Sequence, residues 1–301
     1  LDVCLNHLHS LSNNFAFDII VCNNGSEDNT NQVLDKWESI LSNIKTVRHR
    51  TNILYDRNVA SGYLEVATPY CWVLGDSSTI DSDDFGCLLN FLAEKRPQAV
   101  IINDACENIK KRAGVYRDAN IILRELGWHI TLLSSCVISK DFISSERCKR
   151  YYDTWFLHEG VFFDYLACCD DVEVYLEPQI HPLLLQVGDV KRQNSWRRNP
   201  FYVFGKCWFS FVISLPSLYK IENKLFCIKQ HDVNRKLFSP WRLFLMRLNG
   251  YTSFSDYKEA RPYLKYVLNS SIIYFDIIAE IPSMPKIYKI LRDVWRKVRL
   301  Y

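Results

Sequence analysis

Short apolar runs alternate with helical patterns through the first part of the chain. Apolar runs at 17–22, 70–74 and 99–102 each fit a buried strand, and polar or small residues follow the first two. Between them, residues 28–41 and 83–94 place apolar side chains at helical spacing. Alternation of short strands with helices is typical of a mainly parallel sheet that is covered by helices on both faces. The pattern therefore predicts a doubly wound α/β fold.

The pattern changes after Pro200. Upstream, residues 112–125 are polar and indicate an irregular segment, 130–139 fits a strand or a buried turn, and 151–169 indicates a helix. Downstream, helical spacing recurs in five stretches, namely 201–215, 221–229, 241–248, 256–268 and 286–298. We therefore predict two domains, an α/β domain over 1–200 and a helical region over 201–301.

Composition narrows the function classes. The 301 residues include 37 Lys and Arg against 34 Asp and Glu, a net charge of +3. Nucleic-acid binding needs a strongly basic face, so this balance argues against it. The 11 cysteines follow no disulfide or zinc spacing, which is typical of a reducing compartment and predicts a cytoplasmic protein. No uncharged apolar run reaches the roughly 18 residues of a membrane span.

Two predicted strands end in polar turns. Asn23-Asn24-Gly25-Ser26 follows the first run, and Gly75-Asp76-Ser77-Ser78 follows the second. Ligands of open α/β sheets bind at the carboxyl ends of the strands, and Gly25 permits close approach of the backbone to a ligand. Taken alone, these turns are better interpreted as ordinary strand–turn–helix connections.

The order of these segments resembles the family 2 glycosyltransferases of the GT-A fold. FDIIVCNNGSEDNT comes first, then Asp56-Arg57-Asn58, then YCWVLGDSS, and the likeness covers residues 1–190. WHITLLSSCVISK and SPWRLFLMRLNGY are more loosely similar to enzymes that build bacterial surface polysaccharides such as O-antigen and capsule. The resemblance implies that the family's first strand would precede Leu1, so we interpret the chain as truncated at its N-terminus.

The resemblance also implies a nucleotide site. By position, it consists of Asn23, Asn24, Gly25, Ser26, Arg57 and Asp76. The family holds the nucleoside with a carboxylate where Asn23 and Asn24 stand, and an amide can still bond a base or a ribose hydroxyl. The alternative for Arg57 is a surface ion pair with Asp56 or another acid.

A divalent metal is the implied cofactor. Asp76 matches the first acid of the family's DXD-like motif, but Ser77-Ser78 follows, so the second acid is absent. That motif holds Mg²⁺ or Mn²⁺ against the donor diphosphate through oxygen ligands. The resemblance offers His181 as a second ligand, and the alternative for His181 is a histidine within a turn. We expect a weaker dependence on metal than a complete motif gives.

The resemblance implies that the catalytic base lies at the start of a helix. A strand, a proline and a histidine follow this helix along the chain. Here Leu157-His158-Glu159-Gly160 precedes a strand at 172–176, Pro178 and His181. Glu159 is the predicted base, His158 and Asp153 are the alternatives, and Gly160 replaces the family's second acid. Alternatively, the Glu159 carboxylate could stabilise the helix by interacting with the positive end of the helix dipole at its N-terminus.

Two basic segments suggest further contacts. Arg192, Arg197 and Arg198 fit a lid over the donor diphosphate, because guanidinium groups match phosphate oxygens. A solvated loop is the alternative. Residues Lys286–Arg299 form a basic amphipathic pattern that fits an anionic membrane surface, or else a helix docked on its own domain.

Together these features predict an inverting glycosyltransferase. It would move a sugar from a nucleotide diphosphate donor to a glycan acceptor, lipid-linked, on the inner face of the plasma membrane. One alternative is a non-catalytic nucleotide-sugar-binding protein, which the reduced Asp76 motif and Gly160 would suit. Another is a nucleotidyltransferase, which usually carries a Gly-rich phosphate loop that this sequence lacks.

Overall fold

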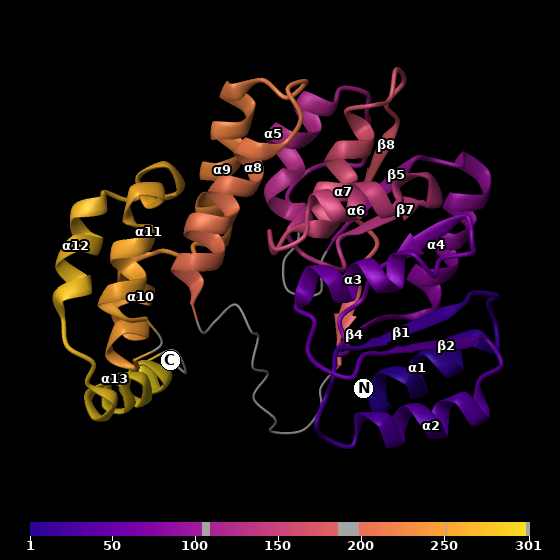
Figure 1. Ribbon diagram of the computed structural model, residues 1–301, viewed down its shortest axis with the longest axis horizontal. Coiled ribbons are helices and arrows are strands. Elements are labelled where there is room, and N and C mark those ends of the chain that lie inside the picture. The colour runs from indigo at the N-terminus through magenta and orange to yellow at the C-terminus, as the bar shows by residue number, and fades with distance from the viewer. Residues whose placement is uncertain (104–108, 186–198, 251, 299–301) are drawn as a thin grey trace. The chain divides into compact units, whose positions relative to one another are not determined.

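The protein consists of two compact units. The computed structural model describes residues 1–103, 109–185, 199–250 and 252–298, with side chains up to residue 291. Unit 1 comprises Leu1–Val190 and Leu215–Lys220, and unit 2 comprises Lys191–Ser214 and Ile221–Tyr301. Unit 1 holds the strands, whereas the described part of unit 2 is helical (Figure 1).

The N-terminal layer of unit 1 is built on two parallel strands, β1 (Ile19–Asn23) and β2 (Ile44–Arg48). Successive side chains of a strand point to opposite faces. Ile19 and Val21 pack with Leu34 and Trp37, while Cys22 lies against Gly62 on the other face. Helices α1 (Asp2–Ser12) and α2 (Thr30–Ile40) lie on one side of β1 and β2 and α3 (Tyr55–Tyr63) on the other (Figure 1).

A five-stranded sheet forms the centre of unit 1, in the order β3-β7-β5-β8-β6. Its strands are β3 (Tyr70–Trp72), β5 (Ala99–Ile102), β6 (Gly114–Tyr116), β7 (Cys136–Ser139) and β8 (Val174–Glu177). The β5–β8 pairing is parallel, and β7 runs antiparallel to both β3 and β5, as β6 does to β8. A separate antiparallel pair joins β4 (Ser78–Ile80) to β9 (Pro182–Leu184). The predicted α/β class is confirmed, with mixed pairings in its sheets.

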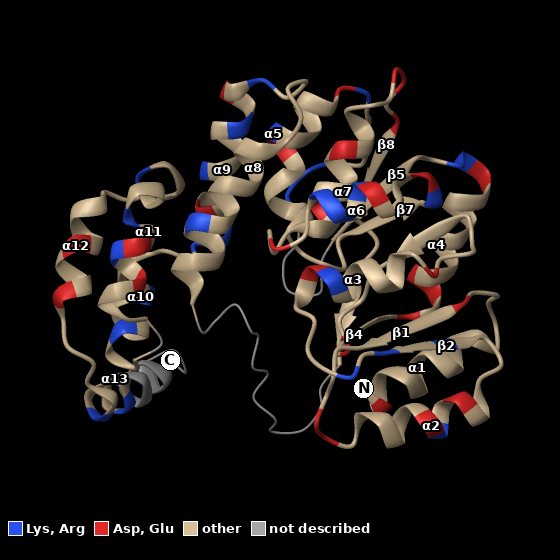
Figure 2. Ribbon diagram, viewed as in Figure 1, with Lys and Arg blue, Asp and Glu red and all other residues tan. Residues whose placement is uncertain are grey.

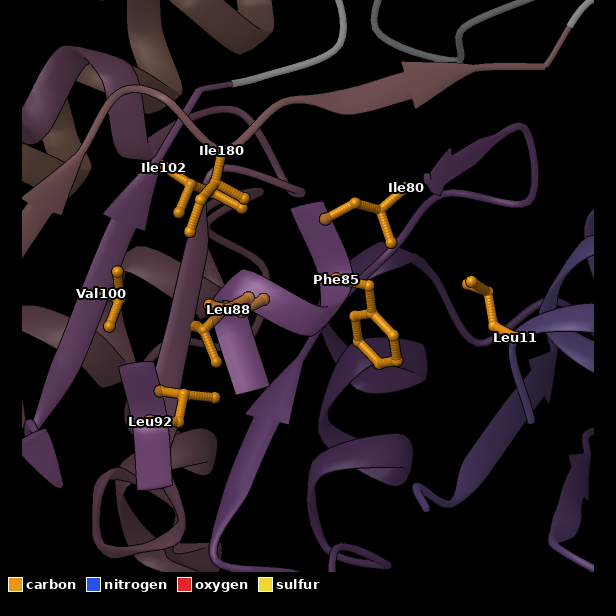
Figure 3. Packing of buried hydrophobic residues seen from close by; sticks show 9 residues of the cluster. Leu11, Ile80, Phe85, Leu88, Leu92, Val100, Ile102 and Ile180 are labelled. Carbon is orange, nitrogen blue, oxygen red and sulfur yellow. The ribbon is translucent and has the colours of Figure 1, made fainter. Parts of the chain in front are cut away.

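Strand β5 is buried on both faces, which explains its uninterrupted apolar sequence. All four of its residues have no exposed surface. Val100 and Ile102 face α4 (Ser82–Lys95), which contributes Phe85, Leu88 and Leu92 to the same cluster (Figure 3). This cluster fixes the central sheet against α4.

The segment predicted to be irregular contains a helix. Helix α5 (Ala119–Ile130) buries Ile122, Leu126 and Ile130 at helical spacing. Asp118 caps its start by accepting hydrogen bonds from the backbone N–H groups of Asn120 and Ile121. The prediction of an irregular segment over 112–125 was therefore wrong. The polar residues around the cap made the apolar spacing of the helix hard to recognise in the sequence.

The predicted helix over 151–169 is shorter than expected. Helix α6 (Ser145–Arg150) precedes it, a short 3₁₀ helix spans Lys140–Phe142, and α7 runs only from Leu157 to Leu166. Between α6 and α7, Asp153 and Trp155 have left-handed backbone conformations, with φ of 65° and 71°. Left-handed residues break a right-handed helix, so the segment 151–156 forms turns instead.

Unit 2 confirms the predicted helices and adds one. A π-helical segment (Phe201–Cys207) continues into α8 (Trp208–Ser214) and is followed by α9 (Ile221–Arg235), α10 (Pro240–Leu248), α11 (Phe254–Val267), α12 (Ile272–Glu280) and α13 (Pro285–Val298). Helix α12 was not predicted. Every helix in the described ranges is too short or too polar to cross a membrane.

Helix α7 packs closely against α6 through its glycine. A Cβ atom built on Gly160 would overlap the ring of Tyr151. That ring is buried, and its hydroxyl donates to Asp164 of α7 over 3.2 Å. Asp164 also accepts from Arg147 over 3.1 Å and from Arg150. The ring is therefore held in place, and position 160 has no room for a side chain.

We predict that Gly160→Ala destabilises the protein. Overpacking of this kind typically costs about 1–3 kcal/mol, because the Tyr151 ring cannot retreat without losing its hydrogen bond. Gly114→Ala is the control, since a Cβ on Gly114 would meet no atom within 4 Å. Urea unfolding measures both variants, and equal stability of the two would contradict the packing argument.

Candidate active site

The turn after β1 is held by its own asparagines. Asn23 donates from its side-chain amide to Asn31 over 2.9 Å and accepts from the Ser26 N–H over 3.0 Å. Asn24 donates to Asn52 over 3.1 Å and accepts from the Ile53 N–H over 2.8 Å. The two amides therefore organise the turn and the loop that precedes α3.

Gly25 allows this turn to touch that loop. Its φ is 69°, and a Cβ atom at this position would lie 2.5 Å from the backbone carbon of Thr51. A side chain at position 25 would thus meet both conformational strain and backbone overlap. Ser26, the last residue of the predicted turn, is exposed.

The first turn of α3 contacts the segment that leads into α7. Arg57 forms a two-bond ion pair with Asp153, at 2.5 and 3.0 Å, and its guanidinium lies 4.9 Å from the centre of the Tyr152 ring. Asp56 is buried and accepts from the backbone N–H groups of Trp155 and Leu157. The sequence left open a surface ion pair of Arg57 with Asp56 or another acid, and the structure shows such a pair with Asp153.

Asp76 and His181 lie apart. Asp76 is exposed in the turn between β3 and β4. In the antiparallel β4–β9 pairing, Ser78 is opposite Leu184 and Ile80 is opposite Pro182. Asp76 precedes Ser78 at one end of this pairing, and His181 precedes Pro182 at the other end. The pairing is roughly 10 Å long, so it separates Asp76 from His181. The structure therefore does not bring Asp76 and His181 together around one ion.

His181 already has structural partners. Its Nδ1 lies 3.2 Å from the side-chain amide nitrogen of Asn103, which can only donate. Its backbone N–H donates to Asp84 over 2.8 Å. Within the ranges that the structure describes, no group of three or more His, Cys, Asp or Glu residues is placed to hold a metal. Asp76, the other predicted ligand, presents an exposed carboxylate, which is the kind of oxygen group that Mg²⁺ and Mn²⁺ bind.

His158 is a buried, neutral histidine. Its Nε2 lies 3.1 Å from the carbonyl oxygen of Ile130, and its Nδ1 lies 3.2 Å from the hydroxyl of Tyr55. A carbonyl only accepts, so Nε2 carries the proton and Nδ1 accepts from Tyr55. Burial lowers the pKa of His158 to about 4, which keeps the ring uncharged at neutral pH.

Glu159 is buried without a partner. Its side chain has no exposed surface, and neither carboxyl oxygen has a hydrogen-bond partner among the described residues. Burial raises the pKa of Glu159 well above its ordinary value, because an ion is costly to hold away from water. Buried carboxyl groups with a raised pKa are frequent at catalytic sites.

Some predicted residues lie outside the described ranges. These are the lid arginines Arg192, Arg197 and Arg198. In α13 the side chains of Lys286 and Lys289 are described and exposed. Sequence reasoning missed Tyr55 and the role of Asp56, whose partners are about 100 positions away along the chain.

Comparison with known proteins identifies the fold. Residues 1–144 match the model of the family described as glycosyl transferase family 2. No curated protein matches the chain. A crystal structure of S. aureus TarS, residues 1–349, is similar with a TM-score of 0.56 at 13% identity, over 98% of this chain and 88% of that one. The same protein in complex with UDP-GlcNAc gives a TM-score of 0.54 at 12% identity, over 97% and 87%.

These matches agree with the geometry of unit 1. The family model covers β1 to β7, including the two strand-end turns and α3. The structural likeness extends over nearly all of the chain and concerns the fold. Residues 1–144 therefore form a glycosyl transferase family 2 region, and the protein is a glycosyltransferase with the GT-A fold.

Proposed function

We propose that this glycosyltransferase moves a sugar, with inversion, from a nucleotide diphosphate donor to a glycan acceptor. The contact between α3 and the start of α7 carries the proposal. Arg57 is the donor-side candidate, and it pairs with Asp153 just ahead of the base candidates His158 and Glu159. The proposed donor-binding residue on α3 and the proposed base on α7 would therefore lie on two helices that contact each other. The UDP-GlcNAc complex of the similar TarS structure supports a nucleotide-sugar donor.

The donor would lie over the turn after β1 and the turn that carries Asp76. Gly25 lets the first turn pack directly against the backbone of Thr51 in the neighbouring loop. The amides of Asn23 and Asn24 already bond protein atoms, so we propose that they shape the nucleotide site by holding Ser26 and the loop at 51–54. Arg57 would have to exchange Asp153 for a phosphate to bind the donor directly.

The chemistry needs a proton acceptor. In an inverting transfer the acceptor oxygen forms a bond to the anomeric carbon while the bond to the diphosphate breaks. The hydroxyl proton then passes to a carboxylate, which we propose is Glu159. Burial keeps the Glu159 carboxyl protonated in the unliganded fold, so we propose that it releases this proton when the site opens to the acceptor. The ionised form is then a stronger base than a solvated glutamate. The acceptor hydroxyl can reach Glu159 only after the side chains that cover it move. A divalent cation bound through Asp76 would offset charge on the departing diphosphate.

The acceptor is proposed to be lipid-linked, as in bacterial surface polysaccharide synthesis at the cytoplasmic face of the membrane. Unit 2 supports this with exposed apolar side chains. Ile273 and Ile277 of α12 are 62% and 61% exposed, and Ile290 of α13 is 63% exposed. Helices α12 and α13 both pack on α10. Figure 2 shows basic residues at the start of α13, where Lys286 and Lys289 are exposed.

A donor screen tests the proposed function. Purified protein is incubated with nucleotide sugars and candidate glycan acceptors in Mn²⁺, in Mg²⁺ and in chelator. We expect transfer from one donor class, reduced but not abolished by chelator, because Asp76 is the sole acid retained from the motif. Abolition by chelator would show a complete metal shell, and no transfer from any donor would refute the function.

We predict that Glu159→Gln lowers kcat by about 10²–10⁴-fold, the usual effect of losing a general base. Gln has the same size but cannot accept the proton. Donor affinity, measured by calorimetry, should stay at the wild-type level, since the donor-side residues lie elsewhere. Near-native kcat would reject Glu159 as the base and leave His158, then Asp153, to be tested.

The same substitution should stabilise the fold, increasingly with pH. The folded chain keeps the Glu159 proton that the unfolded chain releases above about pH 4.5. Stability from the protonated carboxyl is therefore lost as pH rises toward the folded pKa, by about 1.4 kcal/mol per unit. Gln does not titrate, so the gain in unfolding free energy over wild type should widen as the pH rises above about 4.5. A constant difference would mean that Glu159 is not perturbed.

Binding to membranes tests the proposed location. We expect co-sedimentation with vesicles that contain anionic lipid and little with zwitterionic vesicles, because Lys286 and Lys289 attract anionic headgroups. Replacing Ile273 and Ile277 by Ser should weaken binding several-fold. Ile40→Ser is the control, since Ile40 is 48% exposed on α2 in unit 1. Equal binding to both vesicle types would contradict the membrane proposal.

A further inference from the structure

Three consecutive residues of α3 hold one remote segment. The Tyr55 hydroxyl meets His158 over 3.2 Å, Asp56 accepts from Trp155 and Leu157, and Arg57 pairs with Asp153. Tyr55 also stacks on Trp155, with rings 6.4 Å apart and 9° from parallel. Each residue of the first turn therefore contacts a different part of the segment 153–158.

Asp56 is the buried member of this group. Only 3% of its surface is exposed, whereas Arg57 and Asp153 are partly exposed. Its two oxygens accept from the N–H of Trp155 over 2.8 Å and from the N–H of Leu157 over 3.2 Å. The first N–H groups of a helix have no partner within the helix. Phe156, at the cap position of α7, makes no side-chain cap hydrogen bond, so Asp56 supplies the cap from another helix.

The segment that Asp56 holds is conformationally strained. Asp153 and Trp155 have φ values of 65° and 71°, a left-handed conformation that is unfavourable for residues other than glycine. Such a conformation persists only where surrounding contacts hold it. The N–H of Trp155 itself bonds Asp56, so loss of the carboxylate would release the turn directly ahead of α7.

We propose that Asp56 is a positioning residue, which fixes the start of α7 and thereby the places of His158 and Glu159. This role rests on the proposed function, in which Glu159 accepts the proton of the acceptor. Asp56 touches neither donor nor acceptor in this scheme. Its removal should therefore impair the transfer step while leaving donor binding intact.

Asp56→Asn is the test variant. Asn retains one acceptor oxygen and presents an NH₂ group to the other backbone N–H, so one of the two bonds is lost. We expect kcat to fall by about 10²-fold, the effect of a displacement of about 1 Å at a catalytic site. The donor KM should stay within about twofold of wild type. Asp56→Glu, which keeps both oxygens, should recover part of kcat and serves if the Asn variant does not fold.

Asp232→Asn is a matched control in unit 2. Asp232 is also buried and accepts two backbone N–H groups, those of Phe238 and Asn269, each over 2.9 Å. Its substitution removes the same kind of bond and should lower stability similarly. We expect kcat to be unchanged in this variant. Equal loss of kcat in both variants would reduce the role of Asp56 to stability and overturn the proposal.

The titration of His158, followed by NMR, gives a second readout that needs no substrate. In wild type the ring should titrate near pH 4. In Asp56→Asn the titration should move toward the ordinary value of 6.5, because the ring leaves its buried position. An unchanged titration, or an unchanged kcat in an active preparation, overturns the positioning role. A wild-type chain that transfers no sugar refutes the proposed function, and the His158 titration then still decides whether Asp56 positions α7.

Discussion

The enclosure of α7 is the constraint on which the rest of unit 1 depends. All but one of its ten residues are buried, so each polar group on the helix requires a partner inside the protein. Asp164 has Arg147, Arg150 and Tyr151, and His158 has Tyr55 and the carbonyl of Ile130. The Glu159 carboxyl, in contrast, has no hydrogen-bond partner among the described residues. This unpaired carboxyl is the reason why Glu159 is the proposed base.

The strands β1, β3, β5 and β8 could be predicted because buried strands have apolar sequences, whereas the short strands β4, β6 and β9 were not predicted. β5 is apolar throughout since both its faces are covered, and the helical spacing of α2 and α4 follows from one buried face. The direction of β7 could not be predicted, because a run of apolar residues looks the same in either orientation. Helix α5 was recoverable in principle from Asp118 and the spacing of Ile122, Leu126 and Ile130, whereas α12 has an apolar run with weak periodicity.

The resemblance could suggest which residues belong to the candidate site, but it could not predict the contacts between their side chains. The resemblance to the family pointed to the turn after β1, Arg57, Asp76 and Glu159, but a sequence does not state which side chains meet. The separation of Asp76 from His181 follows from the register of β4 against β9, which neither strand specifies alone. The cap that Asp56 provides joins positions about 100 residues apart, so its only local signal was an acid at the start of a helix.

The ring of Tyr151 has a consequence for how this sequence can change over time. The family's second acid would occupy position 160, where the ring leaves no space for any side chain. An acidic residue there is acceptable only after position 151 has become smaller, and a smaller residue at 151 first removes a hydrogen bond from Asp164. Each single step is unfavourable and only the pair is acceptable, which is strong non-additivity between neighbours. The glycine and the tyrosine are therefore expected to be inherited together, so that a homologue with an acid at 160 should have a smaller residue at 151.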